Sequence, residues 1–384
     1  MRGVETVVLL VALATVVAAF ANRLRVPAPS LLVAVGVVVG LLPGAPAVHV
    51  PPEVVSLVVL PPLLYAASEE LAWRDLRAIW RPVAVLAVGL VAASAAAVAA
   101  VAGAVASLSA SMAFVLGAVL ASTDPVAVSA LARRLSLPAR VQALVQAESL
   151  FNDATSLVLF QVAVSLAVGS TAGAATGVLL HGAGRFVTLA AGGVLAGGVV
   201  AAGAIVVRRR ITDPVLETVA ALITPYAAFL LGEAIHASGV TAVIVAGLAV
   251  GAWRPKITTA RTRLQVHAVY QTLIFVLESV VFSLIGLQLP TLIRALPGPE
   301  AWLADALAVT GALIVARMLW VFPLSAVSQR RGGTRPSWPV PAVVSWAGTR
   351  GVVPLTAALS MPWASAATPS STNSRGPNCS ADAL

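Results

Sequence analysis

The chain has 384 residues, of which 59% are hydrophobic and only 10% are charged. This composition excludes an ordinary soluble domain and is typical of a helical membrane protein. The formal net charge is +9, but the arginines are spread over short loops. Their distribution favours a signal of membrane topology over a nucleic-acid-binding surface, so we expect no nucleic-acid partner. The single cysteine, Cys379, excludes an internal disulfide and a cysteine metal site.

Apolar segments recur along almost the whole chain, and most approach the ~20 residues that a membrane-spanning helix needs. We therefore predict an all-α polytopic membrane protein with about 12 transmembrane helices. Two glycine pairs, Gly192-Gly193 and Gly197-Gly198, predict a bend or a re-entrant turn in the long seventh helix. The predicted helices lie near residues 4–21, 29–43, 54–70, 82–103, 110–131, 142–168, 174–206, 215–236, 239–253, 266–289, 301–324 and 339–362.

Basic residues fall on alternate loops of this arrangement. Between the predicted helices, 18 of the 24 lysines and arginines lie on one side, and the opposite loops hold only Arg294. Because cytoplasmic loops carry the excess of basic residues, the arginine-rich side is predicted to be cytoplasmic and the N-terminus external. The 18 residues are Arg23, Arg25, Arg74, Arg77, Arg81, Arg133, Arg134, Arg140, Arg208, Arg209, Arg210, Arg254, Lys256, Arg261, Arg263, Arg330, Arg331 and Arg335.

The end of the chain differs from the rest. Residues 1–363 form the predicted transmembrane domain, whereas residues 364–384 are rich in Ser, Pro and Asn and are expected to form a disordered tail. Twelve helices that start outside also end outside, so the tail is predicted to be external. A truncation or frameshift just before a further helix would give the same sequence pattern.

The fifth predicted helix contains the motif Thr123-Asp124-Pro125. The proline removes an amide donor and clashes with the preceding turn, so carbonyl groups are left without helical partners. Unwound backbone is tolerated at membrane depth only where it lines a cavity or is buried in protein. Transporters use such broken helices to present carbonyl groups and helix dipoles to an ion. The alternative is an ordinary proline kink capped by Asp124.

The sixth predicted helix carries a polar stripe. At 100° per residue, its polar side chains fall within about half of the helical circumference, and Leu150 and Phe151 lie on the other half. Carboxylates at membrane depth are costly and usually mark an ion or proton pathway, and their oxygens suit a small alkali cation. A buried network that only joins helices is the alternative. The stripe comprises Gln142, Gln146, Glu148, Ser149, Asn152, Asp153, Thr155 and Ser156.

A second interruption, Gly348-Thr349-Arg350-Gly351, lies inside the twelfth predicted helix. A buried arginine needs an acidic partner or free carbonyl groups, and the candidate acids are Glu69, Glu70 and Glu278. An acidic and a basic broken segment in the two halves of the chain suggest an inverted repeat.

The remaining charged residues receive simpler interpretations. Arg317 is expected to snorkel to the interface or to bind carbonyl groups, and Glu217 and Glu233 are expected to be interfacial. Glu69 and Glu70 either end their helix at the cytoplasmic interface or have an internal role. The four histidines show no metal-ligand spacing. No nucleophile–base pair is visible, so an enzyme is not expected, and no cofactor is predicted.

The motifs TDPVAVSAL and ESLFNDATSLVLF, separated by a basic loop, resemble those of the sodium/proton exchangers of the NhaP/NHE type, a branch of the monovalent cation:proton antiporters. PPLLYAASEELAWRDLRAIWRP, LESVVFSLIGLQL and GTRGVVPLTAALS also resemble family motifs, in the family's order. The resemblance covers roughly residues 5–362. It implies a fold of 13 helices, a dimerisation domain, a core domain with two crossed, unwound helices, and electroneutral exchange of Na⁺ or Li⁺ for H⁺.

The resemblance also implies roles for single residues. Asp153 is similar to the ion- and proton-binding carboxylate, and Asn152 to its helix-stabilising neighbour. Glu148, Ser149 and the Thr123 carbonyl resemble the other ligands of the transported cation. Asp124 resembles the partner at the helix crossing, and Arg350 the core arginine. The chain departs from the family at Glu69 and Glu70, which come one turn later than the usual acid, and in lacking the last helix.

These observations predict an antiporter that exchanges a monovalent cation for protons at Asp153, in pH and sodium homeostasis. We expect a multi-pass protein of the plasma membrane and a homodimer. The transported ion is Na⁺, Li⁺ or K⁺. The alternatives are a carrier that holds an organic anion with Arg350, and an inactive truncated paralogue.

Overall fold

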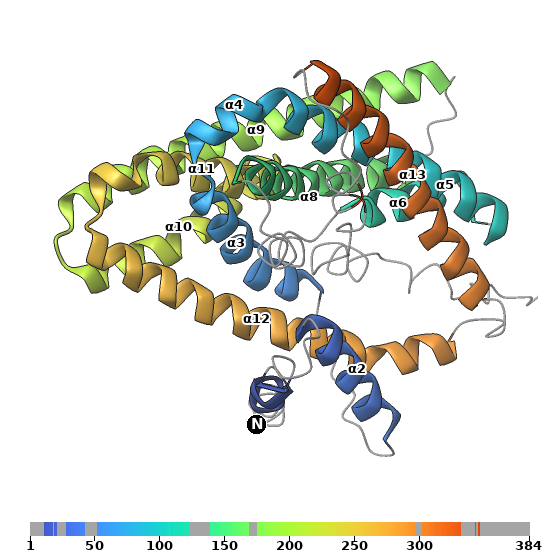
Figure 1. The fold of residues 1–384 in the computed structure, drawn as a ribbon, viewed down its shortest axis with the longest axis horizontal. Helices are drawn as coiled ribbons and strands as arrows, with labels where there is room; N and C mark the ends of the chain where they lie inside the picture. Colours follow the sequence, from blue (N-terminus) through green and yellow to red (C-terminus); the bar gives the residue numbers. More distant parts are fainter. Residues whose placement is uncertain are drawn as a thin grey trace, which may run out of the picture.

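The computed structural model describes residues 11–17, 19–20, 28–42, 52–106, 108–122, 139–168, 175–295, 302–331, 342 and 345. Every regular element within these residues is helical, as the apolar composition predicts (Figure 1). The helices are α2 (Ala28–Leu41), α3 (Pro52–Glu70), α4 (Trp73–Ala84), the π-helical η1 (Val85–Leu90), α5 (Val91–Val105), α6 (Ala110–Leu120), α8 (Ala139–Val168), α9 (Ala175–Arg210), α10 (Pro214–Ala234), α11 (Gly239–Ile257), α12 (Ala260–Ala295) and α13 (Trp302–Arg331).

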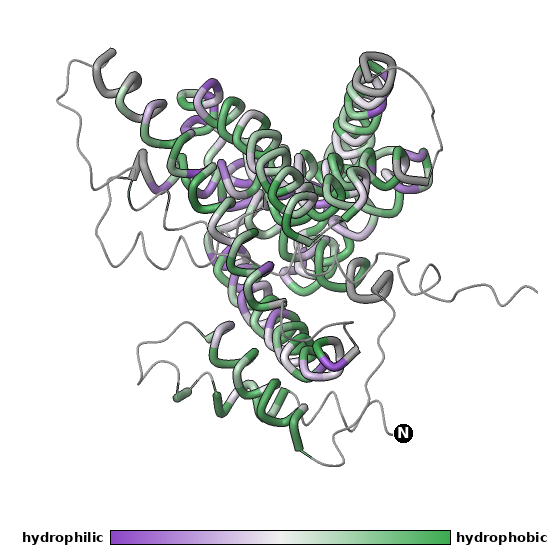
Figure 2. The backbone as a smooth tube through the Cα atoms, turned by 90° about the vertical axis from the view of Figure 1, so that its right-hand side faces the viewer, coloured by the Kyte–Doolittle hydropathy of each residue, from purple (hydrophilic) through white to green (hydrophobic). Residues whose placement is uncertain are grey.

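The membrane character of the sequence is preserved in the folded chain. Among the described residues, seven helical segments are long and apolar enough to cross a membrane, and α2 and α6 are shorter apolar helices. Hydrophobic residues run along most of the length of the tube in Figure 2, in the helices at the edge of the molecule as well as in those at its centre. The polytopic helical fold is thus confirmed, whereas the count of twelve spans stays a prediction.

The helices pack in two groups. In one, α11 packs against α3, α9 and α10, and α12 packs against α2, α3 and α10. In the other, α5 packs against α6 and α13, and α8 packs against α4, η1 and α6. The largest hydrophobic cluster fills the first group and reaches α8 through Ala147, Leu150 and Ala154. Helix α8 therefore lies between the two groups, in the middle of the molecule (Figure 1).

Most predicted helix boundaries agree with the structure, but the fourth, tenth and eleventh helices were predicted too short, the last two because α12 (Ala260–Ala295) and α13 (Trp302–Arg331) extend beyond their apolar segments. The fourth begins at Trp73 rather than near residue 82, because the amphipathic α4 runs directly into η1 and α5. Leu76, Ile79 and Val83 of α4 are buried, while its arginines lower the hydropathy of the segment. A search for uniformly apolar segments misses such a helix.

The predicted re-entrant turn in the seventh helix is wrong, because α9 is continuous from Ala175 to Arg210. Its glycines instead allow α11 to approach closely. A Cβ atom on Gly193 would lie 2.7 Å from the Ser238 carbonyl oxygen, and one on Gly197 would overlap the Ala242 carbonyl oxygen. The glycine pairs therefore serve helix packing.

Two expected features lie outside the described residues. One is the pair of crossed, unwound segments, because residues 123–138 and 346–351 are not described. The other is the polar tail at 364–384. The inverted repeat built on these segments stays a prediction.

Candidate functional site

The central part of the polar stripe of α8 is buried in the protein. Ser149 and Asn152 have no exposed surface, and Glu148 and Asp153 are each 1% exposed. The apolar half of the helix is also covered, since Leu150 is fully buried and Val158 is 1% exposed. Because α8 is enclosed on both sides, its polar groups face protein rather than lipid, as the cost of polar groups in hydrocarbon requires.

Two hydroxyl groups join α8 to the end of α6. Ser122 donates a hydrogen bond through Oγ to Oδ1 of Asp153. One turn further along α8, Ser156 Oγ donates to the Ala118 carbonyl oxygen at 2.6 Å. Helix α6 ends at Leu120, so the helix stops just before the Thr123-Asp124-Pro125 motif, as its proline predicts. Asp153 therefore lies beside the point at which α6 breaks.

Glu148 forms a buried ion pair with Arg317 of α13. Nη2 of Arg317 lies 3.2 Å from Oε2 and 3.3 Å from Oε1 of Glu148. Asn152 Nδ2 donates to Oε1 of the same carboxylate at 3.4 Å. The expectation that Arg317 snorkels to the interface is wrong, because this residue is only 3% exposed. An arginine side chain can stay buried when a carboxylate pairs directly with its guanidinium group, so it does not need to reach the membrane interface.

The structure brings together part of the predicted site. Glu148, Ser149, Asn152 and Asp153 lie on one helix, and all four are buried. Glu278 is half-buried in α12, which belongs to the other group of helices. The remaining predicted residues, Thr123, Asp124 and Arg350, lie outside the described residues.

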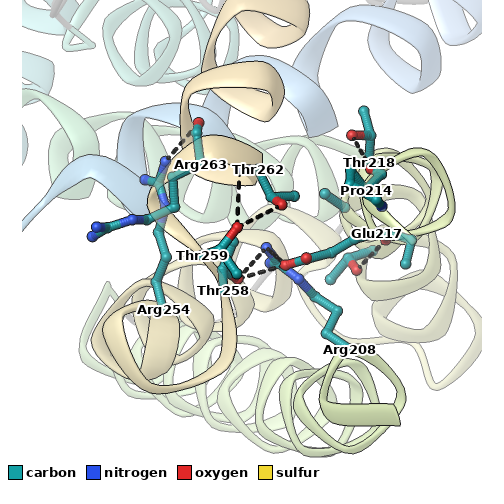
Figure 3. Close-up of polar contacts among 12 residues, drawn as sticks. Arg208, Pro214, Glu217, Thr218, Arg254, Thr258, Thr259, Thr262 and Arg263 are labelled. Atoms are coloured by element: carbon teal, nitrogen blue, oxygen red, sulfur yellow. Dashed lines mark hydrogen bonds and ion pairs between the residues drawn. The ribbon is translucent and has the colours of Figure 1, made fainter. Parts of the chain in front are cut away.

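A second buried polar cluster lies at the ends of α3, α9 and α11 and at the start of α10. Figure 3 shows its members Arg208, Glu217, Arg254 and Thr258. Arg208 is 1% exposed. Its Nη2 donates to Oε1 of Glu217 at 3.1 Å and to Oγ1 of Thr258 at 3.2 Å, and its Nη1 lies 3.5 Å from Oε1 of Glu69. Arg254 lies 4.0 Å from the same Glu69 oxygen. The cluster balances two buried carboxylates with two guanidinium groups.

This cluster shows how two acids at the helix ends are held. Glu217 lies in the first turn of α10, where it is 5% exposed and bonded to Arg208, so it is buried in protein rather than open to solvent. Glu69 has an internal role as an ion-pair partner of Arg208. Glu70 instead lies in a surface contact, 3.1 Å from His267 Nδ1. The pairing of Arg350 with any of these acids stays a prediction.

The same cluster bears on topology. It joins the connections that follow α3, α9 and α11 through contacts among Glu69, Arg208, Arg254 and Thr258. In addition, Arg254 Nη2 donates to the Arg263 carbonyl oxygen at the start of α12, at 3.5 Å. These arginine-rich connections therefore lie together at one end of the helices, as the alternation of basic loops predicts.

Sequence reasoning missed Ser122 and the partner of Arg317. The signal for Arg317 was its isolation in an apolar helix, which requires a buried acid somewhere in the fold. For Ser122 the signal was weaker, a hydroxyl residue directly before the break in α6. In both cases the partner lies on a different helix, so spacing along one helix gives no indication of it.

The arrangement offers one carboxylate whose charge is balanced by an arginine and a second carboxylate held by a hydroxyl. Within the described residues, no group of three or more His, Cys, Asp or Glu side chains could hold a metal ion as a resident cofactor.

Three comparisons place the chain among known proteins. A family model described as "Sodium/hydrogen exchanger, transmembrane" matches residues 8–372. An uncharacterized Na⁺/H⁺ exchanger of Mycobacterium tuberculosis is 38% identical over 374 residues, which cover 94% of this chain and 67% of that protein. The Na⁺/H⁺ antiporter ApNhaP of Aphanothece halophytica is 33% identical over 339 residues, with 88% and 63% covered. The chain thus spans about two thirds of the length of these relatives.

The fold agrees with this relationship. The structure of the sodium proton antiporter MjNhaP1 from Methanocaldococcus jannaschii superposes with a TM-score of 0.75 at 21% identity, covering 94% of this chain and 85% of that one. At this identity the match establishes the fold alone. Together with the match of the family model over residues 8–372, these comparisons show that the chain belongs to the sodium/hydrogen exchanger family.

Proposed function

We propose that this protein exchanges a monovalent cation for protons across a membrane, with Na⁺ as the first candidate and Li⁺ and K⁺ as alternatives. The observation that carries the proposal is the burial of Asp153 on α8 beside the end of α6. The names of the relatives support it, because ApNhaP is called a Na⁺/H⁺ antiporter. A related protein of Bacillus subtilis is called a sodium, potassium, lithium and rubidium/H⁺ antiporter, which supports the wider choice of ion.

The physical basis is competition for one carboxylate. A bare aspartate at the centre of a membrane helix costs about 3 kcal/mol or more. A bound proton or a bound cation removes that cost, and one excludes the other. Glu148 is the poorer candidate for the exchange itself, because Arg317 already balances its charge. Asp153 is therefore the group on which proton and cation alternate.

Other oxygens near Asp153 complete the proposed cation site. Ser149 lies one turn before Asp153 on the same face of α8, and Ser122 already contacts its carboxylate. Thr123 directly follows Ser122, so its carbonyl group is a further candidate ligand. Glu148 keeps acceptor capacity, since a carboxylate offers about four lone-pair sites. Its main role in the proposal is to fix α8 to α13 through Arg317, with Asn152 bonded to it.

The orientation, location and assembly of the protein are proposed from the sequence. We infer that the arginine-rich ends of the helices are cytoplasmic and that the protein lies in the plasma membrane as a homodimer. The gathering of Arg208, Arg254 and Arg263 at one end of the bundle supports the proposed orientation. Asp124, Arg350 and Glu278 keep their proposed supporting roles in the core.

The experiment compares Asp153→Asn with the native protein in everted vesicles that contain a pH-sensitive dye. Adding Na⁺, Li⁺ or K⁺ in turn should release protons in the native protein, whereas Asp153→Asn should abolish the signal. Asp75→Asn is the matched control, since Asp75 is exposed at the start of α4. It should behave as the native protein does. Undiminished cation-driven proton movement by inserted Asp153→Asn would refute the proposal. A signal that needs an added organic anion would point to the alternative carrier.

A further inference from the structure

An open pocket of about 710 Å³ lies beside the start of α9, and none of its lining residues belongs to the polar stripe of α8. Its volume falls within the range of about 300–1,000 Å³ that small-molecule sites occupy. The polar lining is entirely cationic or neutral, with Arg185, His181, His236 and Thr188. Leu180, Gly184 and Leu189 form the apolar part. We call this the α9 pocket.

The charge in the α9 pocket is available to a ligand. Among the described residues, no carboxylate oxygen lies within 4.0 Å of Arg185, which is exposed. Glu233 is the acid nearest to His236 along the chain, and its Oε1 already accepts a hydrogen bond from the Gly239 amide at 3.2 Å. One permanent cation and two imidazole groups suit an anion with several oxygen acceptors.

His236 occupies an unusual backbone conformation at the edge of this pocket. Helix α10 ends with hydrogen bonds from His236 N to Glu233 O and from Ala237 N to Gly232 O, which form a Schellman motif. The residue at this position is left-handed and is most often glycine, yet here it is a histidine with φ 55°. A side chain that the local backbone disfavours is best explained by a use for that side chain.

The backbone holds this histidine firmly against α9. Ser238 N donates to the Leu189 carbonyl oxygen at 3.1 Å, so the turn after α10 is fixed on the helix that supplies the rest of the pocket. A Cβ atom on Gly192 would lie 2.6 Å from the Ala237 Cβ, which shows how closely the two segments approach. The imidazole of His236 and the side chains of α9 therefore face a ligand from a rigid frame.

The position of the α9 pocket along the membrane normal indicates the class of ligand. Arg185 and Arg208 are 23 residues apart on the continuous helix α9, which corresponds to about 35 Å at 1.5 Å per residue. The hydrocarbon core of a bilayer is about 30 Å thick, and the headgroup layers extend the total to about 40–45 Å. If Arg208 marks one edge of the hydrocarbon, Arg185 lies in the headgroup layer of the opposite leaflet. Phosphate groups of lipids occupy that layer.

We propose that the α9 pocket binds the phosphodiester headgroup of an anionic phospholipid. Arg185 supplies the charge, His181 and His236 supply further donors, and Leu180 and Leu189 contact the glycerol and the start of the acyl chains. The assignment is independent of transport and of which leaflet is external. It requires that α9 spans the bilayer with Arg208 near one edge of the hydrocarbon core.

Native mass spectrometry of the purified full-length protein tests the site. Short-chain phosphatidylglycerol should bind, and diacylglycerol of the same chain length, which lacks the phosphate, should not. Arg185→Gln removes the charge. Gly184→Leu fills the pocket, since no atom lies within 4 Å of a Cβ built on Gly184. Each variant should bind phosphatidylglycerol at this site about tenfold or more weakly. It should therefore retain one phosphatidylglycerol fewer per chain.

His236→Gly distinguishes a loss of lipid binding from a loss of folding stability. Glycine suits the left-handed position, so this variant should unfold at the same or a higher temperature, yet it should lose the bound lipid. Arg294→Gln is the matched control, because it removes an exposed arginine from the same end of the helices and should bind like the native protein. Unchanged lipid retention in Gly184→Leu and Arg185→Gln would overturn the proposal. Displacement by inorganic phosphate at concentrations equal to those of the lipid would show a site for a free anion and would also overturn it.

Discussion

The buried pair of Glu148 and Arg317 gives the sharpest energetic prediction. Both side chains are at least 95% buried, and Arg317 Nη2 lies 3.2 Å from Oε2 of Glu148. Replacing Arg317 by methionine keeps most of the volume but leaves a buried carboxylate without its cation. Breaking a buried pair in this way costs about 3–5 kcal/mol. Arg317→Met should therefore lower the free energy of unfolding by that amount.

The double variant Glu148→Gln with Arg317→Met distinguishes the effect of the unbalanced charge of Glu148 from the effect of altered packing at Arg317. Glutamine can still accept the hydrogen bond of Asn152 Nδ2 through its side-chain oxygen, and no buried charge is left unbalanced. Replacing both partners of a buried pair is often nearly neutral, so the double variant should regain most of the lost stability. The assay is thermal unfolding of the purified protein. Unfolding is detected as the loss of the monodisperse size-exclusion peak after heating.

Two results would refute this reasoning. If Arg317→Met is as stable as the native protein, the ion pair does not carry the predicted energy. If the double variant is no more stable than Arg317→Met, the loss comes from packing rather than from the unbalanced charge of Glu148.

Three further predictions concern other parts of the molecule. Gly197→Leu should separate α9 from α11 and destabilise the protein by about 1–3 kcal/mol in thermal unfolding; its control, Gly198→Leu, should be close to neutral, because no atom lies within 4 Å of a Cβ built on Gly198. Arg208→Met should cost about 3–5 kcal/mol, since two buried carboxylates lose their shared guanidinium; Arg209→Met, which removes an exposed cation, should not. Ser122→Ala removes the hydroxyl that stabilises ionised Asp153, worth about 1.5–3 kcal/mol. The concentration of Na⁺ for half-maximal exchange should then rise at least tenfold, and an unchanged value would show that this hydrogen bond does not act on the ion site.

The extent to which the sequence predicts this fold follows from how each feature is encoded. Uniformly apolar helices such as α5, α10 and α11 are visible because every residue contributes to hydropathy. Helix α4 was missed at its start because its buried residues Leu76 and Ile79 alternate with arginines. The glycines of α9 were interpreted as marking a bend or a re-entrant turn, and their packing role was missed, since a glycine that bends a helix and one that allows close packing look alike in sequence.

The candidate site was predictable to the extent that it lies on one helix. Glu148, Ser149, Asn152 and Asp153 follow helical spacing, and their burial agrees with the predicted stripe. The hydrogen bond from Ser122 and the ion pair with Arg317 join residues 31 and 169 positions apart. Pairings over such separations depend on the packing of whole helices, which local pattern does not specify.

The central claim is that proton and cation compete for Asp153. The most direct test is the half-maximal Na⁺ concentration for exchange in proteoliposomes, measured across a range of pH at equal pH on both sides. Competition predicts that this concentration rises about tenfold for each unit of falling pH where the protonated form dominates, while the maximal rate at saturating Na⁺ stays constant. A half-maximal concentration that is independent of pH, with a maximal rate that falls as the medium is acidified, would contradict the account.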